Sequence, residues 1–379
     1  MRAFTIFVVL LLGCAAVAVA QPSHRYVVGS VVVTDLGTLG GAQSTALDVN
    51  DADQIVGWSA TSQGVKHAFE YSNGFMDDIG NAFGPNGISE AAGINASGVI
   101  AGTMTDQFGT MGFVWNAGGV DWLRGPRINN VVETHGLAIN DNGDVAGYVE
   151  SSLAVGAAST VDALIWSGGT RVVKLRVHAI ANDVNASQIA VGRNDTALHA
   201  LVWQFIPVGF HVTQDLVPAL GSAVGTMDAL GVNAGSDVVG YAPVFGSTSN
   251  VVPHAYLWDG IAGVPQDLGV FPMGSNSFAE DINNGRFIAG HGDEHVFKGP
   301  ISITHELAFL WHSNFGMVAL PALPATTWLG SCRAFALNEL KATLHITVVG
   351  ACDVPGSVHA VLWDVTIQSV CVLAPCRFP

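Results

Sequence analysis

The sequence predicts an all-β protein, a seven-bladed β-propeller built from four-stranded antiparallel blades. An Asn followed at a nearly constant distance by a Gly occurs seven times, and each pair precedes a strand-like run that ends in an aromatic residue. The pairs are Asn50/Gly57, Asn95/Gly102, Asn140/Gly147, Asn185/Gly192, Asn233/Gly240, Asn283/Gly290 and Asn338/Gly350. Successive Asn residues lie 45, 45, 45, 48, 50 and 55 positions apart, a period typical of repeat architectures.

Each repeat contains four short apolar runs, which predict four strands. In the first repeat three of these runs cover residues 44–50, 54–57 and 67–71, and a fourth-strand motif covers residues 34–37. The Asn-x-x-Gly turn at 140–143 and the Ser-Asn-Gly turn at 72–74 contain residues that tolerate positive φ, as tight hairpins require. One such sheet is too small to be stable alone, so the repeats must pack face to face. A linear stack of sheets is the alternative, but it would expose apolar end faces without capping units.

The number of fourth-strand motifs predicts how the ring closes. This motif occurs eight times, from residues 33–36 to residues 370–373, whereas the other three motifs occur seven times. Either terminal copy could therefore complete the last blade, and in both cases the chain termini should meet. We expect a lead-in at residues 21–32, the propeller at 33–373 and a tail at 374–379.

The repeats resemble those of the bacterial extracellular HAF-repeat family. The resemblance covers about residues 33–373 and is carried by the His-Ala-Phe run at 67–69, the Asp-Leu-Gly run at 35–37 and the Ile-Val-Gly run at 55–57. It implies a secreted bacterial protein with a propeller-like fold, and it brings no catalytic residues with it. Three repeats lack the His, namely those with Met111, Asp162 and Leu307 at that position.

The first 20 residues differ from the rest and predict a secretory signal peptide that is cleaved after Ala20. They contain Arg2, an apolar stretch at 4–12 and a small-residue motif at 18–20. Residues 11–14 also resemble a lipoprotein cleavage box, with Cys14 as the acylated residue, which is the alternative. We therefore expect a secreted or periplasmic monomer. No later apolar run is long enough to span a bilayer as a helix.

Export makes the cysteines informative, because disulfides persist in oxidising compartments. Four cysteines follow the leader, and all lie in the last repeat. Alignment of the repeats places Cys332 at the start of the first strand, at the position of Ser44, and Cys352 at the facing end of the second strand, at the position of Ser59. We predict disulfides Cys332–Cys352 and, by remainder, Cys371–Cys376. A zinc site is the alternative.

The faces of the propeller are expected to differ in function. The connections between the second and third strands and between blades vary in length, so they mark the expected binding surface, here named the long-loop face. Its aromatic residues could stack on a sugar or a peptide: Phe108, Phe245, Phe271 and Phe297. The alternative is that these residues only pack.

Polar clusters give weaker expectations. His67, His199, His254 and His359 recur at one repeat position, which predicts a hydrogen bond within the scaffold. His291, Glu294, His295 and His305 form the candidate set for a divalent metal. Oxygen-rich turns such as 48–53 lack the full Ca²⁺-loop spacing and indicate hairpin turns instead. No phosphate-binding loop or nucleophile elbow occurs, so no cofactor is expected beyond that metal.

Three functions remain open. With 30 acidic against 14 basic residues, the protein has a net charge of −16, which disfavours nucleic acid as a partner. The favoured hypothesis is a binding module for a glycan or a protein, without catalytic activity. The second is a hydrolase or lyase with its site at the central channel, and unlike polar residues at the axis would favour it. The third is a structural or surface assembly protein.

Overall fold

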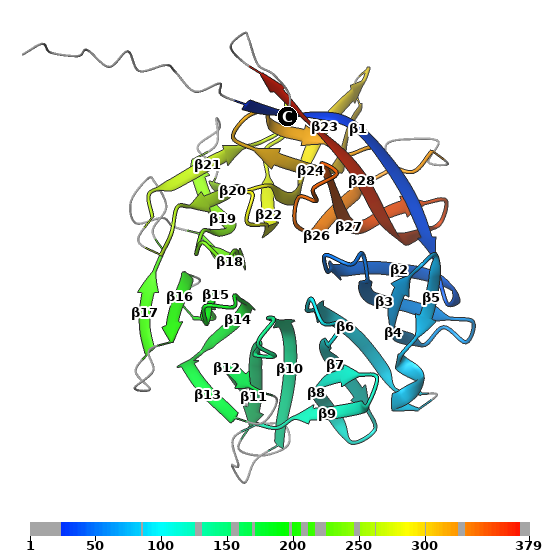
Figure 1. Cartoon of the computed structure of the whole chain (residues 1–379), viewed down its shortest axis with the longest axis vertical. Coiled ribbons are helices and arrows are strands. Elements are labelled where there is room, and N and C mark those ends of the chain that lie inside the picture. The colour runs from blue at the N-terminus through cyan, green and yellow to red at the C-terminus, as the bar shows by residue number, and fades with distance from the viewer. Residues whose placement is uncertain are drawn as a thin grey trace, which may run out of the picture.

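Seven four-stranded blades surround a central channel in the computed structural model, which describes residues 24–84, 86–125, 131–152, 159–168, 171–196, 199–205, 211–216, 225–245, 251–261, 263–299, 301–324 and 330–371 (Figure 1). Six blades are antiparallel meanders of consecutive strands, and the seventh takes its outer strand from the N-terminus and is joined to the first by one parallel pair of residues. The predicted all-β seven-bladed propeller is therefore confirmed. In the described part of the chain the one helix is a short 3-10 turn, η1 (Gly80–Phe83), and no helix is long and apolar enough to cross a membrane.

The strands occupy four positions from the channel outward. The inner strands are β2 (Gly40–Val49), β6 (Ile88–Ile94), β10 (Val131–Ile139), β14 (Ala179–Val184), β18 (Asp228–Val232), β22 (Ser277–Ile282) and β26 (Cys332–Leu337). The second strands are β3 (Ile55–Thr61), β7 (Ile100–Asp106), β11 (Val145–Ser152), β15 (Ile189–Asn194), β19 (Val238–Phe245), β23 (Ile288–Lys298) and β27 (His345–Val354). The third strands are β4 (Lys66–Ser72), β8 (Gly109–Asn116), β12 (Ser159–Ser167), β16 (Ala200–Phe205), β20 (Val251–Trp258), β24 (Ile301–His312) and β28 (Ser357–Cys371). The outer strands are β5 (Phe75–Asp78), β9 (Gly119–Leu123), β13 (Arg171–Val177), β17 (His211–Asp215), β21 (Pro265–Gly269), β25 (Gly316–Ala319) and, for blade 7, β1 (His24–Gly37).

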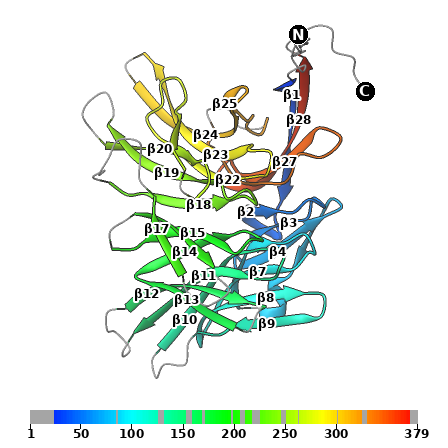
Figure 2. The same cartoon turned by 60° about the vertical axis from the view of Figure 1, so that its left-hand side comes forward.

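The N-terminal strand closes the ring. Strand β1 pairs antiparallel with β28 along its whole length and supplies the outer strand of blade 7, so the N-terminal fourth-strand motif is the one used. The expected C-terminal copy is not a separate strand, because Val370 continues β28 and pairs with Arg25. Most of the expected lead-in therefore belongs to the closing strand, and the two ends of the described chain lie side by side (Figure 2).

The ribbon formed by β1 and β28 extends beyond blade 7 and is anchored on blade 6. The main-chain N–H of Tyr26 donates to Asn314 Oδ1 at 2.7 Å, and Arg25 Nε donates to the main-chain oxygen of Asn314 at 2.8 Å. The Tyr26 ring lies 5.6 Å from the ring of buried Phe287. Apolar packing and hydrogen bonds thus both hold the closing strand.

A closed ring of hydrogen bonds joins the seven repeat asparagines. In each turn between the inner and second strands, the Asn side-chain N–H donates to the main-chain oxygen of the Asn in the next blade, at 2.8–3.3 Å. The last bond runs from Asn338 back to Asn50. The Asn Oδ1 accepts from a main-chain N–H across its own turn, as between Asn185 and Ile189 at 3.0 Å. The face that carries this ring is named the Asn-turn face.

The repeat glycine has a separate cause. Every inner strand carries a β-bulge at the same place, for example between Ala46 and Asp48, and the repeat Gly of the second strand lies opposite it. A Cβ on Gly57 would lie 2.0 Å from the Thr45 main-chain oxygen, and the equivalent distances in the other six repeats are 1.9–2.1 Å. Only glycine fits there. The Asn-to-Gly spacing in the sequence is therefore the distance between the turn, which requires the Asn, and the bulge, which requires the Gly.

The hairpins on the long-loop face are more regular than the sequence suggests. In blade 6 the connection between the second and third strands is short, because β23 and β24 continue as one ladder to Lys298 and Ile301, and the chain turns at Gly299, where φ is +62°. This segment is rich in β-branched residues such as Val296, Ile303 and Thr304, which favour extended backbone. Strand pairing satisfies the main-chain groups that a loop would leave to solvent.

Candidate functional site

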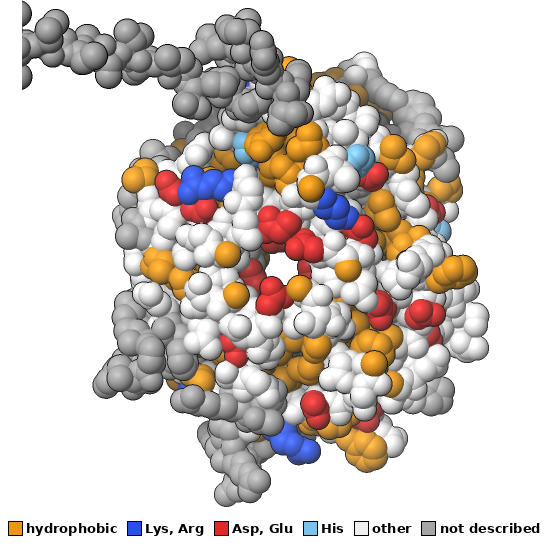
Figure 3. Space-filling model, viewed as in Figure 1, with side chains coloured by type: hydrophobic (Ala, Val, Ile, Leu, Met, Phe, Trp, Pro, Cys, Tyr) orange, Lys and Arg blue, Asp and Glu red, His pale blue; other side chains and the backbone are white. Residues whose placement is uncertain are grey.

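The channel opens on the Asn-turn face through an acidic mouth. A cavity of about 240 Å³ is lined by the seven repeat asparagines and by Asp51, Asp141, Asp281 and Glu339. Acidic side chains gather round this opening in the space-filling view (Figure 3). Burial and the nearby charge of Asp51 raise the pKa of Glu339, although hydrogen bonds from Asn284 oppose the shift. The mouth therefore disfavours anions.

Three aspartates stand at equivalent positions within the channel wall, two residues before the repeat Asn. Each bridges neighbouring blades, because one carboxylate oxygen accepts from the next residue and the other from a main-chain N–H of the following blade. Across blades, Asp48 accepts from the N–H of Ile94 at 2.7 Å, Asp183 accepts from that of Val232 at 2.8 Å, and Asp281 accepts from that of Leu337 at 3.0 Å. Burial raises the pKa of Asp48 to about 8, of Asp183 to about 6 and of Asp281 to about 7.

Nearer the long-loop face, the two innermost strands carry residues that differ from blade to blade. The position just after the repeat Gly pairs directly with a residue of the inner strand, and these two residues are here named the variable pair. The seven variable pairs are Thr45/Trp58, Glu90/Thr103, His135/Tyr148, Ile180/Arg193, Asp228/Tyr241, Phe278/His291 and Arg333/Ala351. Identical backbone thus presents unlike chemistry around the axis, as a site built on a repeat scaffold requires.

Variable pairs of neighbouring blades contact one another. Arg193 of blade 4 binds Asp228 of blade 5 at 2.6 Å, and Asn182 donates to the same carboxylate at 2.7 Å. Burial raises the pKa of Asp228 to about 6, although the Arg193 charge lowers it. The Tyr241 ring lies 5.1 Å from that of Phe278 in blade 6, at 73°. Blades 4 to 6 therefore share a continuous polar and aromatic band.

Glu280 and His291 form an acid and base couple in this band. His291 Nδ1 lies 3.4 Å from Glu280 Oε1, and it has no hydrogen-bond partner among the described residues. Burial raises the pKa of Glu280 to about 8, with a further contribution from Asp228. Burial and the Arg333 charge lower the pKa of His291 to about 4. Both groups are therefore neutral at pH 7, with the proton on the carboxyl group.

A pocket of about 350 Å³ opens between blades 7 and 1 on the long-loop face, and Glu306 of blade 6 also lines it. It is lined by Thr45, Glu306, Ser331, Arg333, Phe335, Ala351, Asp353 and Val358. Arg333 forms an ion pair with Glu306, and its side chain is 51% exposed, so it remains reachable. Asp353 Oδ2 accepts from the Ser331 N–H at 3.0 Å. The pocket thus combines a guanidinium group, carboxylates and an aromatic ring.

The predicted disulfide Cys332–Cys352 is confirmed and supports this pocket. The two residues are directly opposed on β26 and β27. Their Cα atoms are 4.1 Å apart, which is closer than the separation of about 5.5 Å that is most common in disulfides. Their neighbours Ser331, Arg333 and Asp353 line the pocket. Cys371 ends β28 and Cys376 lies outside the described residues, so their predicted pairing stays a prediction.

The four predicted phenylalanines are not gathered in one site. Phe108, Phe245 and Phe297 are exposed on the long-loop face, by 87%, 68% and 61%, and they belong to blades 2, 5 and 6. The prediction that Phe271 belongs to the binding surface is wrong, because its side chain is buried in the core and its ring lies 6.2 Å from that of Phe309. The crossing between blades 5 and 6 folds inward at Phe271, since apolar surface is available beneath it.

The four residues of the expected metal set are also dispersed. Glu294 and His305 are directly opposed and pair at 3.1 Å, whereas His295 Nδ1 contacts Thr304 Oγ1 at 2.8 Å. His291 lies on the opposite side of β23 from Glu294 and faces Glu280 instead. Strand alternation separates residues that are close in sequence.

Three of the four recurrent histidines form the expected hydrogen bond within the scaffold, whereas His199 lies 3.6 Å from Asp215, beyond hydrogen-bond distance. The ring nitrogen of His67 contacts the Asp78 carboxylate at 2.9 Å, and His254 contacts Asp267 at 3.0 Å. In blade 7 the partner of His359 is Asp35 of the N-terminal strand, at 2.9 Å. The His of the third strand and the Asp of the fourth-strand motif therefore form one contact, which ring closure reproduces between the chain ends.

Sequence reasoning missed the variable pairs and the channel aspartates. A signal for them exists, because the residue after each repeat Gly changes between Trp, Thr, Tyr, Arg, His and Ala while the Gly itself does not. Departures from a repeat at one fixed position could have been aligned and read as a candidate site.

Comparisons with known proteins support the fold. The chain is similar to the β-propeller domain of the Trilobed protease from Pyrococcus furiosus, whose structure is described as having an open velcro topology, with a TM-score of 0.50 and 9% identity over 86% of this chain and 94% of that one. It is also similar to an acylaminoacyl peptidase from Pyrococcus horikoshii, with a TM-score of 0.37 and 10% identity over 83% of this chain and 59% of the other. No family model matches the sequence. No curated protein matches it either. At this identity, the first likeness concerns the propeller fold alone.

Proposed function

We propose that the protein is a secreted recognition propeller that binds a carbohydrate in the pocket between blades 7 and 1. The observation that carries this proposal is the pocket itself, where exposed Arg333 pairs with Glu306 beside the ring of Phe335. Guanidinium and carboxylate groups match neighbouring sugar hydroxyls, and an aromatic ring offers an apolar surface to the C–H groups of a sugar. The volume suits one or two sugar units rather than a folded partner.

Two features support export to the cell exterior. The first 20 residues have the composition of a signal peptide, and the Cys332–Cys352 disulfide requires an oxidising compartment to persist. The disulfide lies directly behind the pocket, so oxidation after export would also stabilise the residues that contact the ligand.

A glycan array probed with the mature protein tests the proposal. We expect one class of glycan to be retained, and Arg333→Ala and Phe335→Ala each to weaken its binding at least about tenfold. The matched control is Phe297→Ala, an exposed aromatic residue of the same face outside the pocket. Retention of no glycan contradicts the proposal. If the Phe297 variant loses glycan binding while the Arg333 variant binds normally, the glycan binds elsewhere on the long-loop face and not in this pocket.

The second candidate is a hydrolase or lyase that acts at the channel. The acid and base couple of Glu280 and His291 favours it, because a protonated carboxyl group beside a neutral imidazole can donate and accept protons at neutral pH. Any retained glycan should be incubated with the protein and its products analysed by mass. Cleavage that is lost in both Glu280→Gln and His291→Ala would favour the enzyme, whereas recovery of intact glycan favours recognition.

A further inference from the structure

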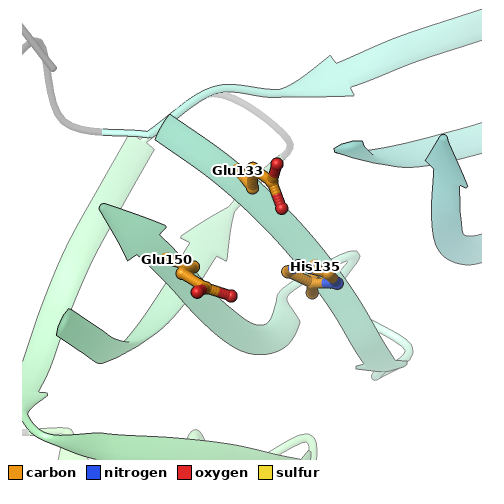
Figure 4. Close-up of side chains that lie close together, drawn as sticks. All are labelled: Glu133, His135 and Glu150. Atoms are coloured by element: carbon orange, nitrogen blue, oxygen red, sulfur yellow. The ribbon is translucent and has the colours of Figure 1, made fainter. Parts of the chain in front are cut away.

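We propose that Glu133, His135 and Glu150 of blade 3 bind a divalent transition metal ion of the Zn²⁺ type. One potential ligand atom from each residue lies within 4.8 Å of the other two (Figure 4). Glu133 and His135 are two positions apart on inner strand β10, so their side chains lie on the same side of it. Glu150 is directly opposite Glu133 on β11. The three side chains therefore project from the same side of one rigid hairpin, next to the channel.

The two carboxylates lack the partners that would explain their proximity. Like charges directly opposed on neighbouring strands destabilise a sheet. Among the described residues neither Glu133 nor Glu150 forms an ion pair with a Lys or Arg, and Glu150 accepts one hydrogen bond, from the Ser159 hydroxyl group. Arg193, on the neighbouring blade 4, is bound to Asp228 at 2.6 Å. A bound cation would remove this repulsion.

The imidazole of His135 is held ready for a ligand. Its ring stacks on the Tyr148 ring at 4.3 Å and 8°, which fixes its orientation. Its Nε2 atom is buried and has no hydrogen-bond partner among the described residues. A buried polar atom without a partner is destabilising, so a group that accepts the nitrogen lone pair would stabilise the site.

The donor set indicates which metal would bind. One imidazole and two carboxylates suit Zn²⁺, Mn²⁺ or Fe²⁺, whereas Ca²⁺ and Mg²⁺ prefer oxygen ligands alone. Ligand atoms around a tetrahedral ion lie roughly 3.4 Å apart at metal–ligand distances near 2.1 Å, so small rotamer changes would close the site. Three protein ligands leave a position for water or for a substrate from the channel. This site is separate from the pocket of blades 7 and 1.

Metal titration of the mature protein, stripped with a chelator, tests the proposal. We expect isothermal titration calorimetry to detect one Zn²⁺ per chain, and Co²⁺ in its place to show absorption typical of nitrogen and oxygen ligands without thiolate bands. The double variant Glu133→Gln/Glu150→Gln and the variant His135→Ala should each bind at least roughly 100-fold more weakly. The matched control Glu294→Gln alters a His and Glu pair of the same protein that lacks a third ligand, and it should bind normally.

A second readout does not depend on metal affinity. Without metal, Glu133→Gln/Glu150→Gln should melt at the same temperature as the wild type or higher, because it removes a repulsion, and it should lose the increase in melting temperature that Zn²⁺ causes in the wild type. Absence of Zn²⁺ binding by the wild type overturns the proposal. Equal weakening in the control, or undiminished binding by the His135 variant, also overturns it.

Discussion

The side-chain amide of Asn338 donates a hydrogen bond of 3.3 Å to the main-chain oxygen of Asn50, which lies 288 residues earlier in the chain. It is the seventh of seven equivalent bonds, and it completes a ring that passes through every blade. Blade 7 is thus joined to blade 1 by the same contact that joins all other neighbours, in addition to the pairing of β1 with β28.

Removing one asparagine of this ring should destabilise the whole propeller. Asn185→Ala loses the donor to Asn233 and the acceptor for Ile189, both in a buried setting, and we expect a loss of about 2–4 kcal/mol in the free energy of unfolding. Urea denaturation followed by tryptophan fluorescence measures it. Asn142→Ala, which removes one exposed bond to Ala186, is the control and should lose less than about 1 kcal/mol. Equal losses would show that the ring contributes nothing beyond a surface hydrogen bond.

The repeat glycine should not tolerate even one methyl group. In Gly240→Ala the new Cβ would meet the Asp228 main-chain oxygen at 2.0 Å, so the bulge must shift, and we expect a loss above about 3 kcal/mol or failure to fold. Gly235→Ala in the neighbouring turn is the matched control, because its Cβ would meet nothing closer than 3.3 Å. Soluble yield and thermal melting compare the two. A Gly240 variant as stable as the Gly235 variant contradicts the steric explanation.

The disulfide should stabilise the last blade. Cys332 and Cys352 close a loop across 20 positions, and Cys332→Ser/Cys352→Ser should lower the free energy of unfolding by about 2–4 kcal/mol. Chemical denaturation of the variant against the oxidised wild type measures this. The reduced wild type provides the control, since it should match the variant. If removal has no effect on stability, ring closure does not depend on this bond.

The channel aspartates should make the protein less stable as pH rises. The pKa of Asp48 is about 8 in the folded protein and 3.8 in the unfolded chain, so between these values the folded state binds the extra proton. The free energy of unfolding then falls with rising pH, by at most about 1.4 kcal/mol per pH unit for one such group. Asp183 and Asp281 act in the same direction over narrower ranges, since their pKa values are raised to about 6 and about 7.

Substitution of one aspartate tests this dependence. Asp48→Asn replaces one of the two accepting oxygens with an NH2 group, which leaves one main-chain N–H without its acceptor, so the absolute stability of this variant is less informative than its slope. Urea denaturation at several values between about pH 5 and pH 8 should give a shallower decline for this variant than for the wild type. Asp77→Asn, an exposed strand residue outside the channel, should retain the wild-type slope. Unchanged slopes in both variants would rule out Asp48 as the titrating group.

Much of the fold could be predicted from the repeats. The seven copies indicated seven blades, the aligned positions of Cys332 and Cys352 indicated their pairing, and the recurrence of His67 and its equivalents indicated a scaffold contact. The candidate sites could not be predicted in the same way. Arg193 and Asp228, 35 positions apart, meet across a blade boundary, and a regular repeat pattern does not reveal which irregular residues face each other.

The sequence by itself determined the local structure of each repeat. It specifies the Asn that accepts the main-chain N–H groups of each turn, the Gly that fits opposite each bulge, and the apolar runs that must be buried. These are short-range requirements of the backbone, and each repeat meets them within about 45 residues. Only the tertiary structure decided that β1 closes the ring, that Phe271 is core, and that Glu133, His135 and Glu150 converge. The reason is physical: ring closure and the burial of Phe271 depend on packing between elements of different repeats, and the meeting of the three side chains depends on the register of β10 against β11, which the repeat pattern does not specify.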